Sequence, residues 1–165
     1  MAERTRSNYR MALPLPADPG SAGAIDGVRR VRAEDREVVA ALLLDAYRGT
    51  IDDEGETLAE ALDAADDLLG TTDPEHSWIL DGPDAATALC LVIHLEGSYY
   101  VNIIAVAAAA KQQGLGRRMV RHAVQALAEA GESEFGATIT DGNTASERLF
   151  ASLGARRVGP WTPMS

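Results

Sequence analysis

The sequence is poor in the residues that build covalent or metal-based cross-links. Its 165 residues include one cysteine, Cys90, which allows no internal disulfide and no zinc site made of several thiolates. Aromatic residues make up only 5% of the chain, and no apolar run approaches the roughly 18 residues that a membrane-spanning helix needs. We therefore expect no metal site and no membrane segment.

Positive charge is also scarce. Lysine and arginine number 15 against 25 aspartate and glutamate residues, a net charge of −10, and the isoelectric point is near 4.7. An acidic protein repels phosphate backbones and anionic lipid surfaces, so we expect neither nucleic acid nor a membrane as a partner. The length and the 46% hydrophobic content suit one globular domain with its own core. The single cysteine suits a cytoplasmic location.

The start of the chain differs from the rest in composition. Residues 1–26 are rich in proline, glycine, serine and alanine, and their short apolar stretch is broken by prolines, unlike a signal peptide. This composition predicts a flexible leader over 1–26 and a single domain over 27–165. Met11 could serve as a second start.

Hydrophobic spacing predicts strands and helices in succession after the leader. Strands are expected at 27–33, 78–80, 88–93, 99–106, 135–140 and 156–158, and helices at 38–46, 57–69, 114–127 and 144–153. Thr57 and Glu60 form a capping box, in which two side chains satisfy free backbone amides at the start of a helix. The order β-α-α-β-β-β-α-β-α-β predicts an α/β fold, a mixed sheet flanked by helices.

The most informative segment spans residues 105–118. A strand leads into a short loop in which Gly114 and Gly116 open a helix. Glycines let the backbone approach a ligand, and a helix N-terminus attracts anions. Basic residues cluster here within an acidic chain: Lys111, Arg117, Arg118 and Arg121. The segment therefore predicts a phosphate-binding loop.

Three kinds of phosphate loop compete for this segment. A Walker loop is excluded, because no Gly-x-x-x-x-Gly-Lys-Ser/Thr occurs in the sequence. A dinucleotide-binding fingerprint needs a third glycine where Met119 stands, and Glu134, the acidic residue at the right distance, precedes the next strand instead of ending it. The remaining interpretation is the pyrophosphate loop of an acyl-coenzyme A enzyme. A nucleotide-binding protein of another α/β fold stays open as an alternative.

Two motifs in this order resemble those of the GNAT superfamily of N-acetyltransferases. The strand ends Ile104-Ala105-Val106 and is followed by Lys111-x-x-Gly114-x-Gly116, which resembles the family's first motif. The family's second motif is resembled by residues 143–155, which read Asn143-x-x-Ser146-x-x-Leu149-Phe150-x-x-x-Gly154-Ala155. The order of strands and helices also matches the family from about residue 27 to residue 158.

The resemblance implies transfer of an acetyl group from acetyl-coenzyme A to a primary amine, by direct attack of the amine in a ternary complex. It implies an acceptor that is a small molecule or a peptide amine. Loop amides would hold the pyrophosphate, and backbone groups of the preceding strand would pair with the pantetheine arm. The implied cofactor-binding residues are Ile104, Val106, Lys111, Gln112, Gln113, Gly114, Leu115, Gly116, Arg117, Asn143 and Phe150.

The catalytic residues are less clearly marked. Phe150 stands where the family commonly has a tyrosine that protonates the departing thiolate, and phenylalanine has no proton to give. For the general base we predict Glu96, in the turn before the strand at 99–106, acting through water. Because side chains alternate along a strand, Tyr100, Asn102 and Ile104 are expected to share one face. Glu96 and Tyr100 are therefore the predicted catalytic residues.

The acidic connector at 52–56 allows two interpretations. It is either a solvated surface or a negative rim that attracts a cationic amine to the acceptor site. Two alternatives to the enzyme also follow from the sequence: a catalytically weak GNAT module that binds acyl-coenzyme A as a sensor or interaction protein, and a nucleotide-binding protein. An exposed sheet edge or helix is compatible with a homodimer.

Overall fold

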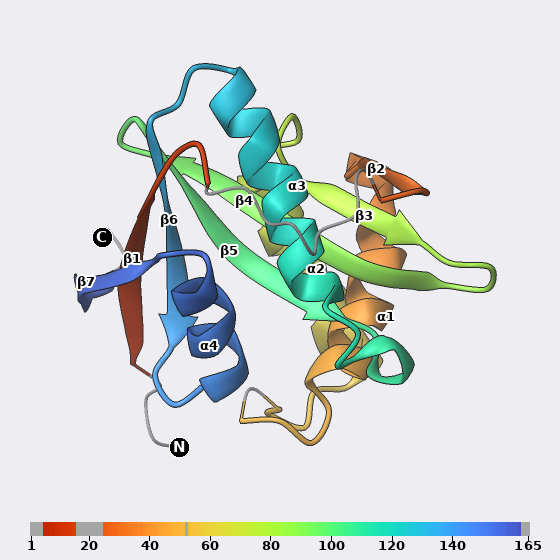
Figure 1. Cartoon of the computed structure of the whole chain (residues 1–165). Helices are drawn as coiled ribbons and strands as arrows, with labels where there is room; N and C mark the ends of the chain where they lie inside the picture. The colour runs from red at the N-terminus through yellow and green to blue at the C-terminus, as the bar shows by residue number, and fades with distance from the viewer. Residues whose placement is uncertain (1–4, 16–24, 52, 163–165) are drawn as a thin grey trace.

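The computed structural model describes residues 5–15, 25–51 and 53–162. In this part of the chain one seven-stranded sheet has the order β2-β3-β4-β5-β6-β1-β7 (Figure 1). The strands are β1 (Arg6–Ala12), β2 (Val28–Arg30), β3 (Trp78–Asp81), β4 (Ala86–Leu95), β5 (Ser98–Val106), β6 (Glu134–Thr140) and β7 (Arg156–Pro160). The α-helices are α1 (Arg36–Tyr47), α2 (Leu58–Thr71), α3 (Leu115–Glu129) and α4 (Thr144–Ser152). The predicted α/β fold with a mixed sheet flanked by helices is confirmed.

The strand directions divide the sheet into two antiparallel halves. Strands β2 to β5 form one half, and β6, β1 and β7 form the other. The halves meet where β5 and β6 pair in parallel, connected by α3. A parallel pair needs such a crossover connection, and a helix commonly provides it.

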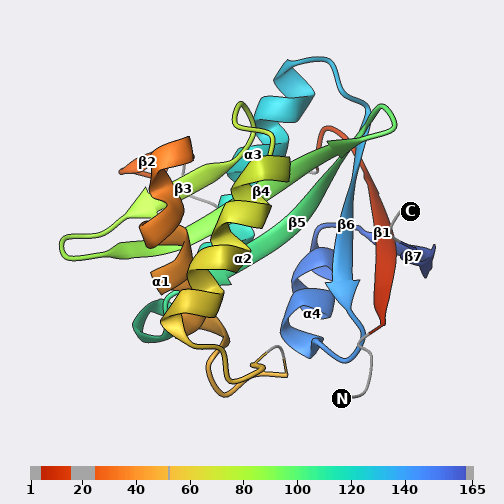
Figure 2. The ribbon, with the colours of Figure 1, turned by 180° about the vertical axis from the view of Figure 1, so that it is seen from behind.

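A hydrophobic core lies on each face of the sheet. One core joins α3 and α4 to side chains such as Cys90, Val92 and Phe135. The other joins α1 and α2 to side chains on the opposite face, such as Leu89 and Leu91. Helices α3 and α4 cover one face of the sheet, and α1 and α2 cover the other (Figures 1 and 2). β4 is therefore buried on both faces over much of its length, which explains why its sequence is continuously apolar.

The helices begin where local signals place them. Thr57 caps α2 and forms the predicted capping box with Glu60. α3 begins after Gly114, which has a positive φ of 74°. That backbone conformation costs a residue with a Cβ about 1–2 kcal/mol, and glycine adopts it freely.

The prediction of a flexible leader over residues 1–26 is wrong for β1. Arg6–Ala12 lies between β6 and β7 and pairs with both, and Met11 is a core residue with 2% of its surface exposed. The strand RSNYRMA lacks regular apolar alternation, since its place in the sheet depends on backbone pairing with distant strands. Residues 1–4 and 16–24 of the predicted leader lie outside the described residues.

A bulge in β5 changes which side chains share a face. Leu91 pairs with Ile103 and Val92 pairs with Val101, so Asn102 is an extra residue in the ladder. The predicted common face of Tyr100 and Ile104 is therefore wrong, because one extra residue reverses the alternation of side chains beyond it.

The bulge also lies where β5 and β6 separate. The two strands pair only at Tyr100–Gly136 and Val101–Ala137, and beyond this point they diverge (Figure 1). From Asn102 onward, β5 has no further registered pair with β6 in the described structure. A cavity lies in this gap.

Candidate functional site

A cavity of about 360 Å³ lies between the diverging strands. Its walls come from Asn102–Ile104 of β5, Thr138–Thr140 of β6, the last turns of α1, the inner side of α2 and the start of α4. Elements from both halves of the sheet thus meet around one space. The bulge and the separation of the strands create it.

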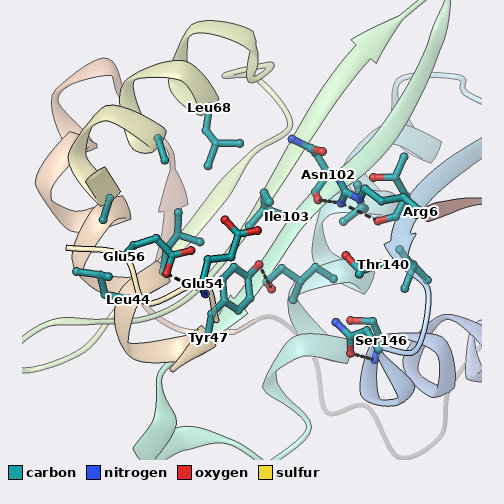
Figure 3. Close-up of a pocket in the computed structure, with 18 of the residues that line it drawn as sticks. Arg6, Leu44, Tyr47, Glu54, Glu56, Leu68, Asn102, Ile103, Thr140 and Ser146 are labelled. Carbon is teal, nitrogen blue, oxygen red and sulfur yellow. Dashed lines mark hydrogen bonds between the residues drawn. The ribbon is translucent and has the colours of Figure 1, made fainter. Parts of the chain in front are cut away.

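Charged groups of opposite sign line two sides of this cavity (Figure 3). Glu54 and Glu56, from the connector between α1 and α2, lie on the same side as Tyr47. Arg6 lies on the other side with Asn102. Two carboxylates of the acidic connector at 52–56, those of Glu54 and Glu56, therefore line the cavity. Asp52, at the start of this connector, lies outside the described residues.

Arg6 reaches from β1 into the gap between the two halves of the sheet. One of its guanidinium nitrogens donates to the carbonyl oxygens of Asn102 and Thr138, each at 3.2 Å. The first carbonyl belongs to the bulge and the second to β6, so Arg6 bridges the strands where they part. The sequence does not mark Arg6 as a site residue, because the composition of residues 1–26 predicts a flexible leader.

Tyr47 is a second residue that the sequence did not single out. It ends α1, and its hydroxyl donates to the carbonyl of Ile104 at 3.3 Å. Ile104 was expected to bind the cofactor through its backbone. The phenol of Tyr47 therefore lies at the predicted binding edge of β5.

The end of α1 is also tied to the loop before α3. The Asp45 carboxylate accepts from the Ala108 amide at 2.8 Å, and the Lys111 ammonium donates to the Ala46 carbonyl. Lys111, predicted to bind the cofactor, thus directs its charge at the carboxyl end of α1, where a cation is favourable. Asp45, Ala46 and Tyr47, three consecutive residues of α1, therefore contact β5 and the segment between β5 and α3 at one wall of the cavity.

The glycine loop, residues 111–114 before α3, has two residues in the left-handed backbone region. Gln112 and Gly114 have positive φ values of 66° and 74°, and the first helical bond of α3 runs from the Arg118 amide to the Gly114 carbonyl. A helix start exposes the amides of its first turn and carries a partial positive charge. The predicted residues Gln112, Gln113, Gly114, Leu115, Gly116 and Arg117 all lie in this loop and turn.

Gly116 explains how the loop stays close to β5. A Cβ atom on Gly116 would lie 3.1 Å from the Leu149 side chain. It would also lie 3.6 Å from Ile104 and 3.7 Å from Val106. The glycine allows α3 to pack tightly against β5 and α4, which brings the two predicted motifs and the predicted residues Ile104 and Val106 together.

Asn143 and Phe150 place α4 at the opposite wall. The Asn143 side chain caps the helix by accepting from the Ser146 amide at 3.2 Å. Phe150 is 2% exposed, and both residues line the cavity.

The structure does not bring Glu96 and Tyr100 to this cavity. Glu96 is exposed in the turn between β4 and β5, and the Tyr100 hydroxyl accepts from Arg10 at 2.6 Å. The Tyr100 ring covers Gly136, where a Cβ atom would lie 2.5 Å from the ring. Neither residue is among those that line the cavity.

The described residues contain no group of three or more His, Cys, Asp or Glu side chains arranged to hold a metal ion. No helix in the same ranges is long and apolar enough to cross a membrane.

Comparison with known protein families finds one family whose sequence model matches this chain. The sequence model described as the acetyltransferase (GNAT) family matches residues 36–155. No curated protein matches the chain. A GCN5-related N-acetyltransferase from Sphaerobacter thermophilus has a similar structure, with a TM-score of 0.66 and 16% identity over 95% of this chain. The match covers 49% of that protein, so the chain spans about half its length.

Two further solved structures match over three quarters of the chain. A diaminobutyrate acetyltransferase from Paenibacillus lautus, in complex with L-2,4-diaminobutyric acid and coenzyme A, has a TM-score of 0.56 and 20% identity, covering 76% of this chain and 72% of its own. A ribosomal-protein-alanine N-acetyltransferase from Brucella melitensis has a TM-score of 0.58 and 22% identity, covering 77% and 82%. At these identities the matches establish a shared fold.

Proposed function

The chain belongs to the acetyltransferase (GNAT) family, and from this premise we propose that it transfers the acetyl group of acetyl-coenzyme A to a primary amine. One observation carries the proposal. In the described structure, the edge of β5 that β6 leaves without a registered strand partner leads through residues 107–114, which include a short 3₁₀ turn at Ala108–Ala110, to the start of α3. An exposed strand edge can form backbone hydrogen bonds with the amides of the pantetheine arm. The amides at a helix N-terminus can bind the pyrophosphate of coenzyme A.

The residues present fit coenzyme A. Backbone groups of Ile104 and Val106 would hold the pantetheine arm, and amides from Gln112 to Arg117 would hold the pyrophosphate. The positive φ values of Gln112 and Gly114 support this proposal, because left-handed residues are common in anion-binding turns. When bound, acetyl-coenzyme A supplies the activated acetyl group.

The acceptor that the cavity supports is a small cationic amine or a peptide amine. Glu54 and Glu56 line the cavity beside Tyr47 and across from the bulge in β5 (Figure 3). Carboxylates there attract an ammonium group and orient it toward β5. The matched structures include enzymes named for diaminobutyrate and for the alanine of a ribosomal protein, both of which present an amine.

Direct attack requires the amine and the acetyl group to share one space, and the cavity joins the β5 edge to the acidic connector. The amine must first lose a proton, and holding both reactants in one geometry removes much of the entropic barrier. Glu96 and Tyr100 stay sequence-based predictions for catalytic residues. Neither lines this cavity, so Glu96 would act as the base only through water.

A second candidate function is a catalytically weak module that binds acyl-coenzyme A as a sensor. The presence of Phe150 favours this second candidate. Its ring is buried and has no proton to donate, at the position where the family commonly has a tyrosine. Turnover with a panel of amines separates the two candidates.

The first test is thermal unfolding with acetyl-coenzyme A, free coenzyme A, ATP or NADH. A ligand at about 100 times its dissociation constant stabilises a protein by about 2.7 kcal/mol, which raises the Tm by several degrees at this size. We expect a shift with both coenzyme A species and a smaller one with ATP or NADH. A shift with ATP or NADH alone would contradict the proposed cofactor.

A matched pair of variants locates the binding site. Aspartate and asparagine both tolerate the left-handed backbone of Gly114, and they differ only in charge. We expect Gly114→Asp to weaken coenzyme A binding at least tenfold relative to Gly114→Asn, because like charges repel near the pyrophosphate. Equal affinities of the two variants would place the pyrophosphate elsewhere.

A further inference from the structure

We propose that Tyr47 is the proton donor to the departing thiolate, in place of the hydroxyl that Phe150 lacks. This inference rests on the proposed acetyltransferase function. Phe150 is buried against the cavity and carries no exchangeable proton. A proton for the leaving group therefore has to come from another side chain around the same space, or from water.

Few described side chains around the cavity can supply that proton. Among them, hydroxyls are carried by Tyr47, Thr138, Thr140 and Ser146. A thiol has an ordinary pKa of about 8.5 and a phenol of about 10, so a phenol can share its proton with a thiolate at small cost. An aliphatic hydroxyl is a far weaker acid than a phenol and is closer to water in acidity. Chemistry thus favours the one phenol in this set.

The position of Tyr47 supports the same choice. Its hydroxyl lies 3.3 Å from the Ile104 carbonyl, on the strand edge proposed to hold the pantetheine arm. Glu54 and Glu56 lie on the same side of the cavity, so the phenol is near both the β5 edge and the proposed acceptor side (Figure 3).

The neighbours of Tyr47 in the chain hold it in place. Asp45 accepts from the Ala108 amide at 2.8 Å, and the Ala46 carbonyl accepts from the Lys111 ammonium. These contacts fix the last turn of α1 against the loop that follows β5. Lys111 thus contacts the residue that precedes Tyr47.

The proposed step conserves atoms and charge. The amine nitrogen forms a bond to the acetyl carbon, and the carbon–sulfur bond breaks with its electron pair left on sulfur. Tyr47 gives its phenol proton to that sulfur. The proton that the amine releases returns to Tyr47 through water, so the products are the acetylated amine, the free thiol and an unchanged tyrosine.

The test compares Tyr47→Phe with Tyr99→Phe. Tyr99 stacks on His94 with ring centroids 4.2 Å apart, away from the residues that line the cavity, so Tyr99→Phe controls for loss of any one phenol. We expect Tyr47→Phe to lower kcat by about 10²- to 10⁴-fold, the usual contribution of a general acid, while Tyr99→Phe keeps wild-type turnover. The thiolate that leaves from an acetyl thioester of an aromatic thiol is stable without protonation. With such a thioester, the loss of kcat in Tyr47→Phe relative to the wild type should therefore be at least tenfold smaller.

A binding measurement provides a readout that does not depend on turnover. The thiolate of bound coenzyme A is titrated by its ultraviolet absorbance in the wild-type protein and in Tyr47→Phe. A hydrogen bond to the charged form favours that form, so we expect the bound thiol to have a pKa about one unit lower in the wild type. Arg6, Glu54 and Glu56, the charged side chains that line the cavity in the described structure, are common to both proteins, and the difference isolates the phenol.

The outcomes separate this inference from the proposed function. If the wild-type protein acetylates no amine, the proposed function fails. If it does, and Tyr47→Phe has equal deficits with both thioesters or leaves the thiol pKa unchanged, Tyr47 is not the donor. Recovery of kcat in the double variant Tyr47→Phe/Phe150→Tyr would further support a missing phenol as the cause.

Discussion

Single side chains decide how firmly the first helix is attached to the sheet. Asp35, at the start of α1, is 6% exposed and accepts two hydrogen bonds from the Arg29 guanidinium, both at 2.8 Å. It also accepts from the Arg32 amide at 2.7 Å. Arg29 lies on β2, so this pair fixes α1, and with it Tyr47, to the edge of the sheet.

Replacing Asp35 tests the strength of this attachment. Burial by itself would raise the pKa of Asp35, but the hydrogen bonds from Arg29 and Arg32 outweigh burial and lower it. A lowered pKa adds stability above the ordinary carboxyl value of about 3.9, and that stability is lost as the pH falls through the folded value. We expect Asp35→Asn to cost about 2 kcal/mol at pH 7 and clearly less near pH 2, measured by urea unfolding.

The exposed pair of Arg36 and Asp66 is the matched control. Its contact is as short, at 2.7 Å, but the side chains are 41% and 52% exposed. Exposed ion pairs contribute about 0–1 kcal/mol, so Asp66→Asn should have a small effect. Equal losses in the two variants would show that burial of Asp35 is not the cause.

Strand β1 is the element of the sheet that the sequence pattern does not reveal. It lies between β6 and β7, and it carries Arg6 to the point where β5 and β6 part. Its ladder with β6 spans seven residue pairs, from Arg6–Thr140 to Ala12–Glu134. Without β1, β7 has no partner in the described sheet.

Two truncations test the place of β1. A chain that begins at Met11 lacks Arg6 and most of the β1 ladder, whereas a chain that begins at Thr5 retains the whole strand. We expect the Thr5 chain to unfold with a wild-type Tm. The Met11 chain should lose its cooperative thermal transition, because two strand edges and the core around Met11 become exposed. A folded Met11 chain with the wild-type Tm would restore the interpretation of this segment as a leader.

Over the whole molecule, the two proposed substrates approach regions of opposite charge. The net charge is −10, and the connector with Glu54 and Glu56 adds negative charge at the cavity. The glycine loop and the first turns of α3 instead carry Arg117, Arg118 and Arg121. This separation suits a cationic acceptor and an anionic cofactor.

Neutralising the connector tests the charge of the acceptor. Glu54 and Glu56 are the connector carboxylates that line the cavity. We expect the double variant Glu54→Gln, Glu56→Gln to raise KM for a cationic amine by about tenfold at low salt, and to weaken the dependence of KM on salt. The control variant Glu37→Gln, Asp63→Asn removes the same charge from exposed positions that do not line the cavity. Similar kinetics in the two variants would mean that the connector is only a solvated surface.

The sequence by itself determined the elements from residue 28 onward, their order and the family. Helix periodicity, the capping box at Thr57 and the spacing of Gly114 and Gly116 are local, because each depends on residues a few positions apart. The two motifs that contain Ile104 and Asn143 are of the same local kind. Both residues do line the cavity between β5 and β6.

Only the tertiary structure decided which further residues surround that cavity. Arg6 contacts a carbonyl 96 positions away, and Tyr47 contacts one 57 positions away; neither has a local signature. The bulge at Asn102 likewise appears only when β4 and β5 are paired, and it reverses the face on which Tyr100 was expected. Backbone pairing and contacts between distant residues form only when the whole chain folds, so a local pattern cannot reveal them.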